Sequence, residues 1–442
     1  MAGGRATRLP APVAWHVPRW TSQPFSAGTW STLAPGGTPL HRADVGEPVD
    51  GRFVICADAT NPTAPSMVHG AVAEGIRGAQ WAVECGARRV IVIGAGAAGL
   101  GAAGELAAAG IDVLLLEARH RTGGRVHTVG LGARGDGTAV AVDAGAAWLQ
   151  QWPTNGLARR VESLGVPTVA SDFGSSLAAS PEGEASSSIE STVSAAAAVL
   201  QRQAALLAPA GSMLDVHTAC SAGADDAGRR AFQRALEVDL LLEHGVAPSE
   251  WGAGALGEDG VGVGDRWLRD GYAPVLATIA GGVDAQCGRA VRAVTWDAGG
   301  VHVTHEPVDA GGAVVGERAT DRADVAICTI PVWLLGSIDL APGLPAAHRR
   351  ALSMLRPARV EKVVMRFAER WWPAPANGAV LRWYDEPAGW GEWFDLTDGL
   401  GEPVVVAFCA GEAVGRLVDG RTDDDVVAGA VQALRRFTDL YR

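Results

Sequence analysis

The sequence predicts an α/β fold with a parallel sheet, and three observations in one short stretch predict it. Residues 90–93 are a run of valine and isoleucine, which is typical of a strand buried on both faces. Gly94, Gly96 and Gly99 follow directly, with the spacing GxGxxG, and open an alanine-rich segment. A second apolar strand is expected at 111–116, which completes a β-α-β unit of the Rossmann type.

Each part of this unit has a physical function in holding a dinucleotide. Gly94 and Gly96 allow a tight turn beneath a pyrophosphate, and Gly99 lets the helix expected at 100–109 approach the strand. The N-terminus of that helix faces the phosphates. Glu117 follows the second strand, where its carboxylate can accept hydrogen bonds from ribose hydroxyls and would repel a 2′-phosphate.

Two further segments, 116–125 and 143–148, complete the pattern that begins with the β-α-β unit. The first contains a second glycine pair, Gly123-Gly124, which a nicotinamide dehydrogenase does not need. Together the segments resemble the FAD-dependent amine oxidase family, which includes monoamine, polyamine and L-amino-acid oxidases and lysine-specific histone demethylases. The resemblance implies FAD contacts from Glu117, Arg119, Gly123, Gly124, Arg125, Gly145 and Ala146.

The signature that closes the family's chains stands at the beginning of this one. Residues 20–31 resemble its Trp-x-x-Asp-Pro-x-x-x-Gly-x-Tyr-Ser segment. Residues 52–60 and 66–71 resemble its flavin-closing strand and final helix. The resemblance implies further cofactor contacts from Asp58, Ala59, Met67 and Val68, and from the backbone of Val291 to adenine.

The reversed order of the two signatures predicts a circular permutation. Reordered as 88–442 followed by 1–87, nearly the whole chain matches the family pattern. Residues 86–87 then form the new joint, which requires the family's original termini to lie close together. A fusion of fragments from two such proteins is the alternative, but each signature occurs only once.

The implied architecture is a Rossmann-like FAD-binding α/β domain interleaved with an α+β substrate domain of mixed sheet and helices. We expect the FAD-binding domain to combine 45–165 and 262–345. The substrate-binding domain then combines 1–44, 166–261 and 346–442.

Two segments outside the motifs carry structural predictions. Residues 226–244 place Phe232, Leu236 and Leu240 at helical spacing, which indicates a packed helix. Residues 290–294 are interpreted as an edge strand that contains Val291.

Composition is typical of a soluble enzyme rather than a nucleic-acid-binding or membrane protein. The 442 residues are 48% hydrophobic and 19% charged, enough for a large core, and the net charge of −12 disfavours nucleic acid or anionic membrane as partner. Six scattered cysteines show neither a CxxC pair nor metal-ligand spacing, so we expect no metal and a reducing cytoplasmic location. The N-terminal residues contain no secretory apolar region, and no 18-residue apolar run predicts a membrane span. The sequence does not determine the oligomeric state, and a homodimer stays open.

Lys362 is the only lysine among 37 lysine and arginine residues. A compositional bias that replaces lysine wherever charge alone is needed predicts that this one does something arginine cannot. An ammonium is a compact donor on a flexible stem, whereas a guanidinium is a fixed planar fork. Lys362 and Trp371-Trp372 match the family segment whose lysine holds a water at flavin N5, so the resemblance implies a catalytic Lys362. A surface lysine is the alternative, which the alternation Val360, Lys362, Val364 disfavours.

The resemblance also implies which residues face the flavin and how the cofactor is attached. The family often faces the flavin with two aromatic rings, and Trp30 and Met67 stand at those positions. The Met67 sulfur can contact a bulky substrate, or Met67 can be plain packing, and both interpretations stay open. Thr29 replaces the cysteine of flavin-linked monoamine oxidases, which predicts non-covalent FAD. Asp58 replaces the family's usual glutamate and has a shorter reach.

Tryptophan is abundant, with 15 residues against three tyrosines, which indicates an aromatic cavity. We expect Trp148, Trp30, Trp383 and Trp390 at the substrate pocket. The sequence around Trp148 is closer to the polyamine oxidase version than to the amino-acid oxidase version.

Three hypotheses follow. The first is FAD-dependent oxidation of an amine to an imine, with dioxygen reduced to hydrogen peroxide. The second is oxidation of an amino acid or modified amino acid on the same scaffold. The third is a flavin-binding protein with little turnover that acts through partners.

Overall fold

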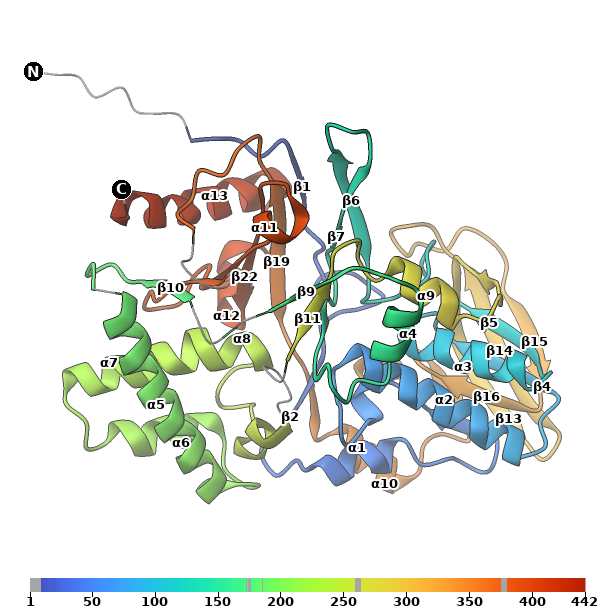
Figure 1. The fold of residues 1–442 in the computed structure, drawn as a ribbon. Helices are drawn as coiled ribbons and strands as arrows, with labels where there is room; N and C mark the ends of the chain where they lie inside the picture. Colours follow the sequence, from blue (N-terminus) through green and yellow to red (C-terminus); the bar gives the residue numbers. More distant parts are fainter. Residues whose placement is uncertain are drawn as a thin grey trace, which may run out of the picture.

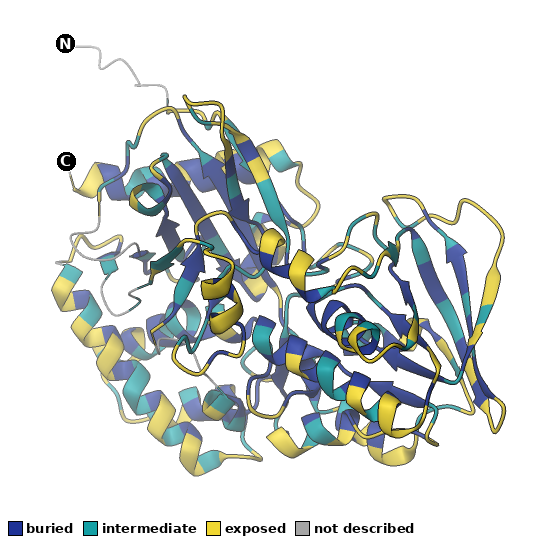
Figure 2. Cartoon of the chain, turned by 45° about the vertical axis from the view of Figure 1, so that its right-hand side comes forward, coloured by how far each residue is buried: buried dark blue, intermediate teal, exposed yellow. Residues whose placement is uncertain are grey.

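Two sheets organise the chain, one parallel and one mostly antiparallel (Figure 1). The computed structural model describes residues 9–171, 173, 176–184, 186–258, 264–374 and 380–441. In Figure 1 the parallel sheet lies on the right, the antiparallel sheet at the upper left, and a group of helices below it. The strands of both sheets are largely buried, as the dark blue ribbons of Figure 2 show.

The parallel sheet contains the predicted β-α-β unit. Its strands, in spatial order, are β12 (Ala285–Gln286), β5 (Asp112–Leu116), β4 (Arg89–Ile93), β16 (Val325–Cys328) and β3 (Phe53–Ile55). The predicted strands at 90–93 and 111–116 and the intervening helix, α3 (Ala97–Ala108), are confirmed. A parallel sheet with buried strands explains the continuous apolar runs in the sequence.

Helix α3 packs closely against α2 (Val68–Glu84). A Cβ atom on Gly75 of α2 would lie 1.9 Å from the main-chain oxygen of Ala98, so only glycine permits this separation of the two helices. The first residue of each helix, Val68 and Ala97, lines the cavity that is described below.

A four-stranded sheet adjoins the parallel one, in the order β15 (Ala319–Ala323), β14 (Gly300–Pro307), β13 (Arg289–Asp297), β17 (Asp339–Ala341). The prediction of an edge strand at 290–294 is wrong, because β13 has a partner on each side. The short β17 pairs with it in parallel, with Ala293 opposite Asp339.

The antiparallel sheet is covered by α13 (Asp423–Leu440), whose apolar face includes Leu434 and Phe437. Its strands, in spatial order, are β1 (Ala14–His16), β19 (Val360–Arg366), β22 (Val404–Ala410), β21 (Glu392–Asp395), β20 (Val380–Trp383) and β10 (Ser176–Ala179). Only β10 joins in parallel. Lys362 lies on β19, opposite Phe408 of β22.

The helical group confirms the helix predicted within 226–244. The run begins as α7 (Asp226–Arg234), continues as a π-helical segment (Ala235–Leu240) and ends as α8 (Leu241–His244), where Gly245 adopts a φ of 65°. Helices α5 (Ser186–Leu207) and α6 (Met213–Ser221) pack beside it.

Smaller elements complete the fold. Two two-stranded ladders pair β2 (Ser31–Leu33) with β18 (Leu355–Pro357) and β6 (Thr128–Ala133) with β7 (Ala139–Asp143). A third small sheet joins β8 (Trp148–Leu149), β11 (Arg266–Leu268) and β9 (Thr168–Ala170). The short helices are α1 (Pro39–Val45), η1 (Asp58–Thr60), α4 (Ala158–Ser163), η3 (Ala253–Glu258), α9 (Ala273–Ile279), η4 (Val332–Ser337), α10 (Ala346–Leu352), α11 (Thr397–Leu400) and α12 (Glu412–Leu417).

The N-terminal segment is integrated into the rest of the chain. Strands β1, β2 and β3 pair with β19, β18 and β16 respectively. Every strand of the parallel sheet falls within 45–165 or 262–345, and every strand of the six-stranded sheet falls outside those ranges. The domain division itself stays a prediction. Over the described residues, no helix is both long and apolar enough to cross a membrane.

Candidate active site

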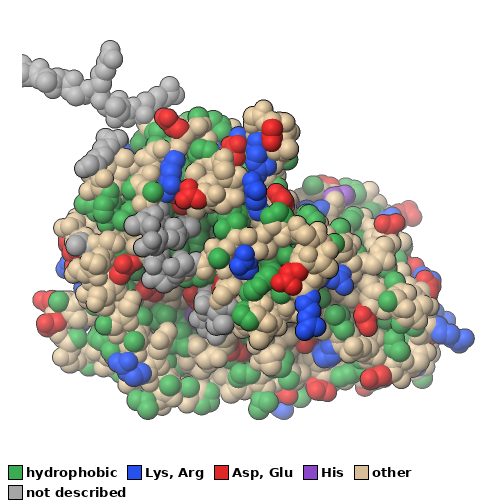
Figure 3. All heavy atoms as spheres, viewed as in Figure 1, with side chains coloured by type: hydrophobic (Ala, Val, Ile, Leu, Met, Phe, Trp, Pro, Cys, Tyr) green, Lys and Arg blue, Asp and Glu red, His purple; other side chains and the backbone are tan. Residues whose placement is uncertain are grey.

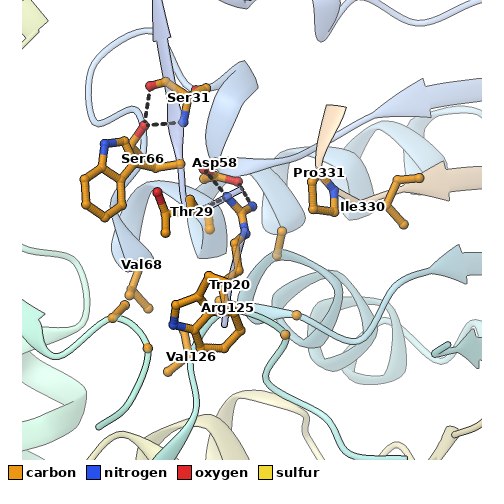
Figure 4. A pocket seen from close by; sticks show the side chains of 18 of the residues that line it. Trp20, Thr29, Ser31, Asp58, Ser66, Val68, Arg125, Val126, Ile330 and Pro331 are labelled. Carbon is orange, nitrogen blue, oxygen red and sulfur yellow. Dashed lines mark hydrogen bonds and ion pairs between the residues drawn. The ribbon is translucent and has the colours of Figure 1, made fainter. Parts of the chain in front are cut away.

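A cavity of about 520 Å³ is lined by residues from both large sheets. The glycine loop after β4 lines one part of it, and Lys362 of β19 lines another. Figure 4 shows part of its wall, with Asp58 and Arg125 directed toward one another. The predicted site residues that line the cavity are Trp30, Asp58, Met67, Val68, Gly94, Gly96, Glu117, Arg119, Gly123, Gly124, Arg125, Gly145, Ala146, Trp148, Val291 and Lys362.

The charged side chains on the face drawn in Figure 3 form no patch that indicates a binding site. Figure 3 shows acidic and basic side chains interspersed over the face that it draws, with no large area of a single sign. We therefore base the function on the cavity and not on the charge of this face.

The glycine loop provides a cradle next to the N-terminus of α3. Gly94 has a φ of 97°, and a Cβ atom on Gly99 would lie 1.8 Å from the Gly94 oxygen, so Gly99 contributes through helix packing rather than by lining the cavity. Gly96 is different, because its φ is −74° and its Cβ would meet only Gly124 Cα, at 4.0 Å. The protein alone would therefore accept alanine at 96, whereas a ligand in the cradle would meet the added methyl group.

Glu117 is held rigidly beside this cradle. It is 5% exposed, and its carboxylate accepts hydrogen bonds from the N–H groups of Ala95 at 2.7 Å and Arg119 at 2.8 Å. Burial raises the pKa of Glu117, and these two N–H groups oppose the change. The main-chain N–H of Arg289, on β13, donates to the main-chain oxygen of Glu117, which brings β13 and Val291 to the same end of the cavity.

Asp58 pairs with Arg125, a contact the sequence did not predict. Arg125 Nη2 lies 2.5 Å from Asp58 Oδ1, and Arg125 Nη1 donates to the Thr29 oxygen at 2.6 Å (Figure 4). The guanidinium also lies 5.2 Å from the centre of the Trp333 ring. The short aspartate side chain therefore orients an arginine of the second glycine motif.

Lys362 is buried and bonded to the chain segment that contains Gly145. Its Nζ donates to the main-chain oxygens of Gly145 at 2.5 Å and Asp143 at 3.1 Å. Burial lowers the pKa of Lys362 to about 8, and the nearby Asp143 and Glu361 carboxylates oppose that change. Nζ also lies 5.5 Å from the centre of the Phe408 ring.

Aromatic rings line the cavity beside Lys362. Trp148 lies 4.7 Å from Phe394 and 5.8 Å from Phe173, and Phe394 lies 5.5 Å from Phe408, measured between ring centres. These four residues, which we call the aromatic wall, all line the cavity. Sequence reasoning missed the three phenylalanines, because the position of Phe408 opposite Lys362 emerges only from the strand register.

Trp383 and Trp390 are not in the lining of this cavity, which corrects their placement at the substrate pocket. Both belong to the apolar cluster that contains α13. Trp383 packs edge-on against Phe437 at 5.2 Å, and Trp390 lies 6.5 Å from Trp393. Strand β20 turns Trp383 toward α13 rather than toward the cavity.

A buried polar group near Ser31 was also missed. Arg42 is fully buried and forms a bidentate pair with Glu258 at 2.7 and 2.8 Å. The same guanidinium donates to Ser31 Oγ and to the main-chain oxygen of Ala59. Ala59 thus contributes its carbonyl to this group and does not line the cavity.

The family model described as flavin containing amine oxidoreductase matches residues 4–82 and 224–440, which is more than half of the chain. The chain belongs to the flavin containing amine oxidoreductase family. A model for NAD(P)-binding Rossmann-like domains matches residues 92–161, which hold the glycine loop and Glu117.

Relatives in the family are histone demethylases and polyamine oxidases. The chain is 27% identical over 376 residues to lysine-specific histone demethylase 1 homolog 1 of Arabidopsis thaliana, covering 78% of this chain and 42% of that protein. It is 27% identical over 375 residues to polyamine oxidase 2 of the same plant, covering 78% and 72% respectively. The chain therefore spans less than half the length of the demethylase relative.

Solved structures of putrescine oxidase share the fold. A triple mutant with redesigned cofactor binding superposes with a TM-score of 0.61 at 20% identity, covering 80% of this chain and 82% of the other. The wild-type protein bound to putrescine gives a TM-score of 0.57 at 20% identity, covering 79% and 81%.

FAD is the cofactor of this family, and the described residues fit it. The open face of Gly96 and the N-terminus of α3 suit a pyrophosphate, and Glu117 suits ribose hydroxyls. The Nε atom of Arg119 is buried without a hydrogen-bond partner among the described residues, which leaves a donor for an anionic ligand.

Proposed function

We propose that the protein oxidises a small amine with FAD and dioxygen. In the overall reaction, the amine, dioxygen and water become a carbonyl compound, ammonia or an amine, and hydrogen peroxide. The bound isoalloxazine supplies the two-electron chemistry. Membership of the amine oxidoreductase family and the likeness to relatives named polyamine oxidase support this proposal.

Lys362 is the observation that carries the proposal. Lys362 lines a cavity that also contains the glycine cradle, and it is the only lysine in the chain. Two of its three possible hydrogen bonds go to the carbonyls of Asp143 and Gly145. The third N–H can hold a water where dioxygen or an imine reacts. Trp30 and Met67 line the same cavity and would restrict how the amine nitrogen is presented.

Anaerobic bleaching of the bound flavin tests this function. The purified protein is mixed with amines or L-amino acids without air, and absorbance near the visible flavin maximum is followed. Bleaching by an amine, reversed by air with release of hydrogen peroxide, is the expected result. Bleaching by L-amino acids alone would replace the amine with the amino-acid hypothesis, and no bleaching by either class would contradict both.

We propose that FAD is held without a covalent bond. Thr29 lines the cavity, and its hydroxyl donates to the Ala358 oxygen at 3.0 Å. A threonine hydroxyl lacks the nucleophilic sulfur that a thioether link needs. Acid precipitation is expected to release all of the flavin into the supernatant, and yellow precipitated protein would contradict this.

We propose a circular permutation of the family's chain order. Helix α2 ends at Glu84 and β4 begins at Arg89, so the new joint is short. At the other junction, Leu9 packs on the apolar cluster that contains α13. A gene encoding 88–442 followed by 1–87 is expected to give a folded, FAD-binding protein. Failure to fold with several linkers would contradict the permutation.

The cysteines support a cytoplasmic location, which we include in the proposal. Three of them, Cys56, Cys328 and Cys409, are buried, and all six are free thiols. A reducing compartment preserves such thiols. Fractionation of the producing cells is expected to recover the protein with cytoplasmic markers.

A further inference from the structure

The aromatic wall has a composition that restricts what lies beside Lys362. Trp148, Phe173, Phe394 and Phe408 form one continuous set of ring contacts, with centre-to-centre distances from 4.7 to 6.2 Å. Phe408 connects this set to Lys362. Any amine whose nitrogen reaches Lys362 must therefore place its neighbouring atoms near aromatic carbon.

The acidic residues of the cavity are already engaged. Glu392, next to the aromatic wall, pairs with Arg382 at 2.9 Å, and Glu258 pairs with Arg42. Asp58 pairs with Arg125, and Glu117 accepts hydrogen bonds from two main-chain N–H groups. Glu361 Oε1 accepts from Thr21, whereas its Oε2 has no hydrogen-bond partner among the described residues; Glu361 belongs to β19, which contributes no residue to the aromatic wall. Neither of the remaining two in the described lining, Glu243 and Asp265, is free.

The existing partners of these carboxylates limit how many ammonium groups a substrate can bring into the cavity. A diamine or polyamine carries a second ammonium group, and taking that group out of water requires a carboxylate that is not already paired. Glu392 is a poor candidate, because binding a second cation would mean competing with Arg382 for the same carboxylate. The aromatic wall thus offers apolar contact to the body of the substrate, and the carboxylate beside the wall is already paired.

The arginines lead to a similar conclusion about carboxylated substrates. Arg42 and Arg125, the lining arginines near Ser31 and Thr29, are ion-paired and bonded to main-chain oxygens. The other three lining arginines lie at the Glu117 end of the cavity: Arg119, whose main-chain N–H donates to Glu117, and Arg289 and Arg292 of β13. An amino-acid carboxylate beside the aromatic wall would lack a free guanidinium among these residues.

We propose that the substrate is a monoamine with an aromatic or similarly bulky apolar body, and not a diamine, polyamine or amino acid. This inference rests on the proposed amine oxidation. The amine nitrogen lies toward Lys362, and the apolar body lies on the aromatic wall. Ring contacts with Phe173 and Phe394 then stabilise the bound body in edge-to-face or tilted geometry.

Equilibrium binding of amines that cannot be oxidised tests recognition by the aromatic wall independently of turnover. Two amines without a hydrogen on the nitrogen-bearing carbon, tert-butylamine and α,α-dimethylphenethylamine, cannot be oxidised and differ by a phenyl group. Their Kd values are measured with the holoenzyme by changes in the flavin spectrum. We expect the aromatic amine to bind at least about tenfold more tightly. Equal Kd values would overturn the proposal.

Oxidation of matched substrates gives the second test. We expect phenethylamine to be oxidised at least about a hundredfold more efficiently than 1,4-diaminobutane, when the two substrates are compared by kcat/KM. The reverse preference would overturn this inference and leave amine oxidation intact. Absence of oxidation for every amine would remove the proposed function itself, so the two failures are distinguishable.

A substitution in the aromatic wall tests whether its rings cause the preference for aromatic amines. Phe173→Leu keeps an apolar side chain and removes one ring, so the KM for phenethylamine should rise by about two- to tenfold, the size of one ring contact. The KM for an aliphatic amine such as butylamine should change less. Phe232→Leu is the matched control, because Phe232 is a partly buried phenylalanine of α7 outside the cavity. Equal changes for both substrates in Phe173→Leu would contradict a role in ring recognition.

Discussion

Lys362 Nζ donates a hydrogen bond of 2.5 Å to the main-chain oxygen of Gly145, which joins β19 of the antiparallel sheet to the loop after β7. A Cβ atom on Gly145 would lie 1.9 Å from the Arg125 oxygen, so this loop also packs directly on the second glycine motif. The lysine is therefore positioned by the same backbone that forms the cofactor site. Its location depends on the relative placement of both sheets.

Replacing Lys362 with methionine removes the ammonium and keeps an unbranched chain of similar length. We expect flavin reoxidation or turnover to slow by about 10²- to 10⁴-fold, the usual effect of removing a positioned proton-transfer group. FAD should stay bound. Stopped-flow mixing of the reduced enzyme with dioxygen measures the rate, and unchanged kinetics would refute the assigned role.

The lowered pKa of Lys362 predicts a pH dependence of stability. The side chain titrates near 8 in the folded protein and near its ordinary pKa of 10.5 when unfolded. Between these values the unfolded chain binds the additional proton, so the free energy of unfolding rises with pH. Urea unfolding from about pH 7.5 to about pH 10.5 should show wild type gaining stability relative to Lys362→Met. A constant difference across this window would contradict the lowered pKa of the buried lysine.

Gly96→Ala separates cofactor binding from folding. Its φ and its open Cβ position allow alanine in the protein, but the methyl group enters the cradle. We expect FAD affinity to fall at least about tenfold, while the melting temperature of the protein without FAD stays nearly constant. Gly130→Ala is the control, since nothing lies within 4 Å of its Cβ position. Equal FAD affinity in both variants would place the pyrophosphate elsewhere.

Asp58→Asn weakens the attachment of Arg125. The two side chains are largely buried, with 10% and 20% exposure, so loss of one charge should cost about 1–3 kcal/mol of folding stability. The reoriented arginine should also raise the Kd for FAD. Equilibrium dialysis measures the Kd, and urea unfolding measures the stability. A normal Kd together with a normal free energy of unfolding would mean that the pair does not organise the site.

The sequence predicted those elements whose signal lies in contiguous residues. The glycine spacing and the buried runs predicted β4, α3 and β5, because each signal is local to its element. The alternation of Val360, Lys362 and Val364 indicated β19 for the same reason. These signals do not require knowledge of the neighbouring strands.

Contacts between distant segments were beyond sequence reasoning. The Asp58–Arg125 and Arg42–Glu258 pairs join residues that only the folded chain brings together. The aromatic wall combines residues of β8, β21 and β22 with Phe173, so no periodicity shows it. Trp383 and Trp390 were misplaced because tryptophan abundance indicates burial without indicating which side of a sheet is occupied.

The order of strands in the parallel sheet also has a consequence for how the chain acquires its structure during synthesis. β3 and β4 are consecutive strands in the chain, yet β16 lies between them and is synthesised far later. Until β16 emerges from the ribosome, β3 has no strand partner in this sheet and β4 has one open edge. Formation of the cofactor sheet thus depends on long-range pairing, which is typical of slow folding. A nascent chain that stops before Val325 exposes an edge open to aggregation.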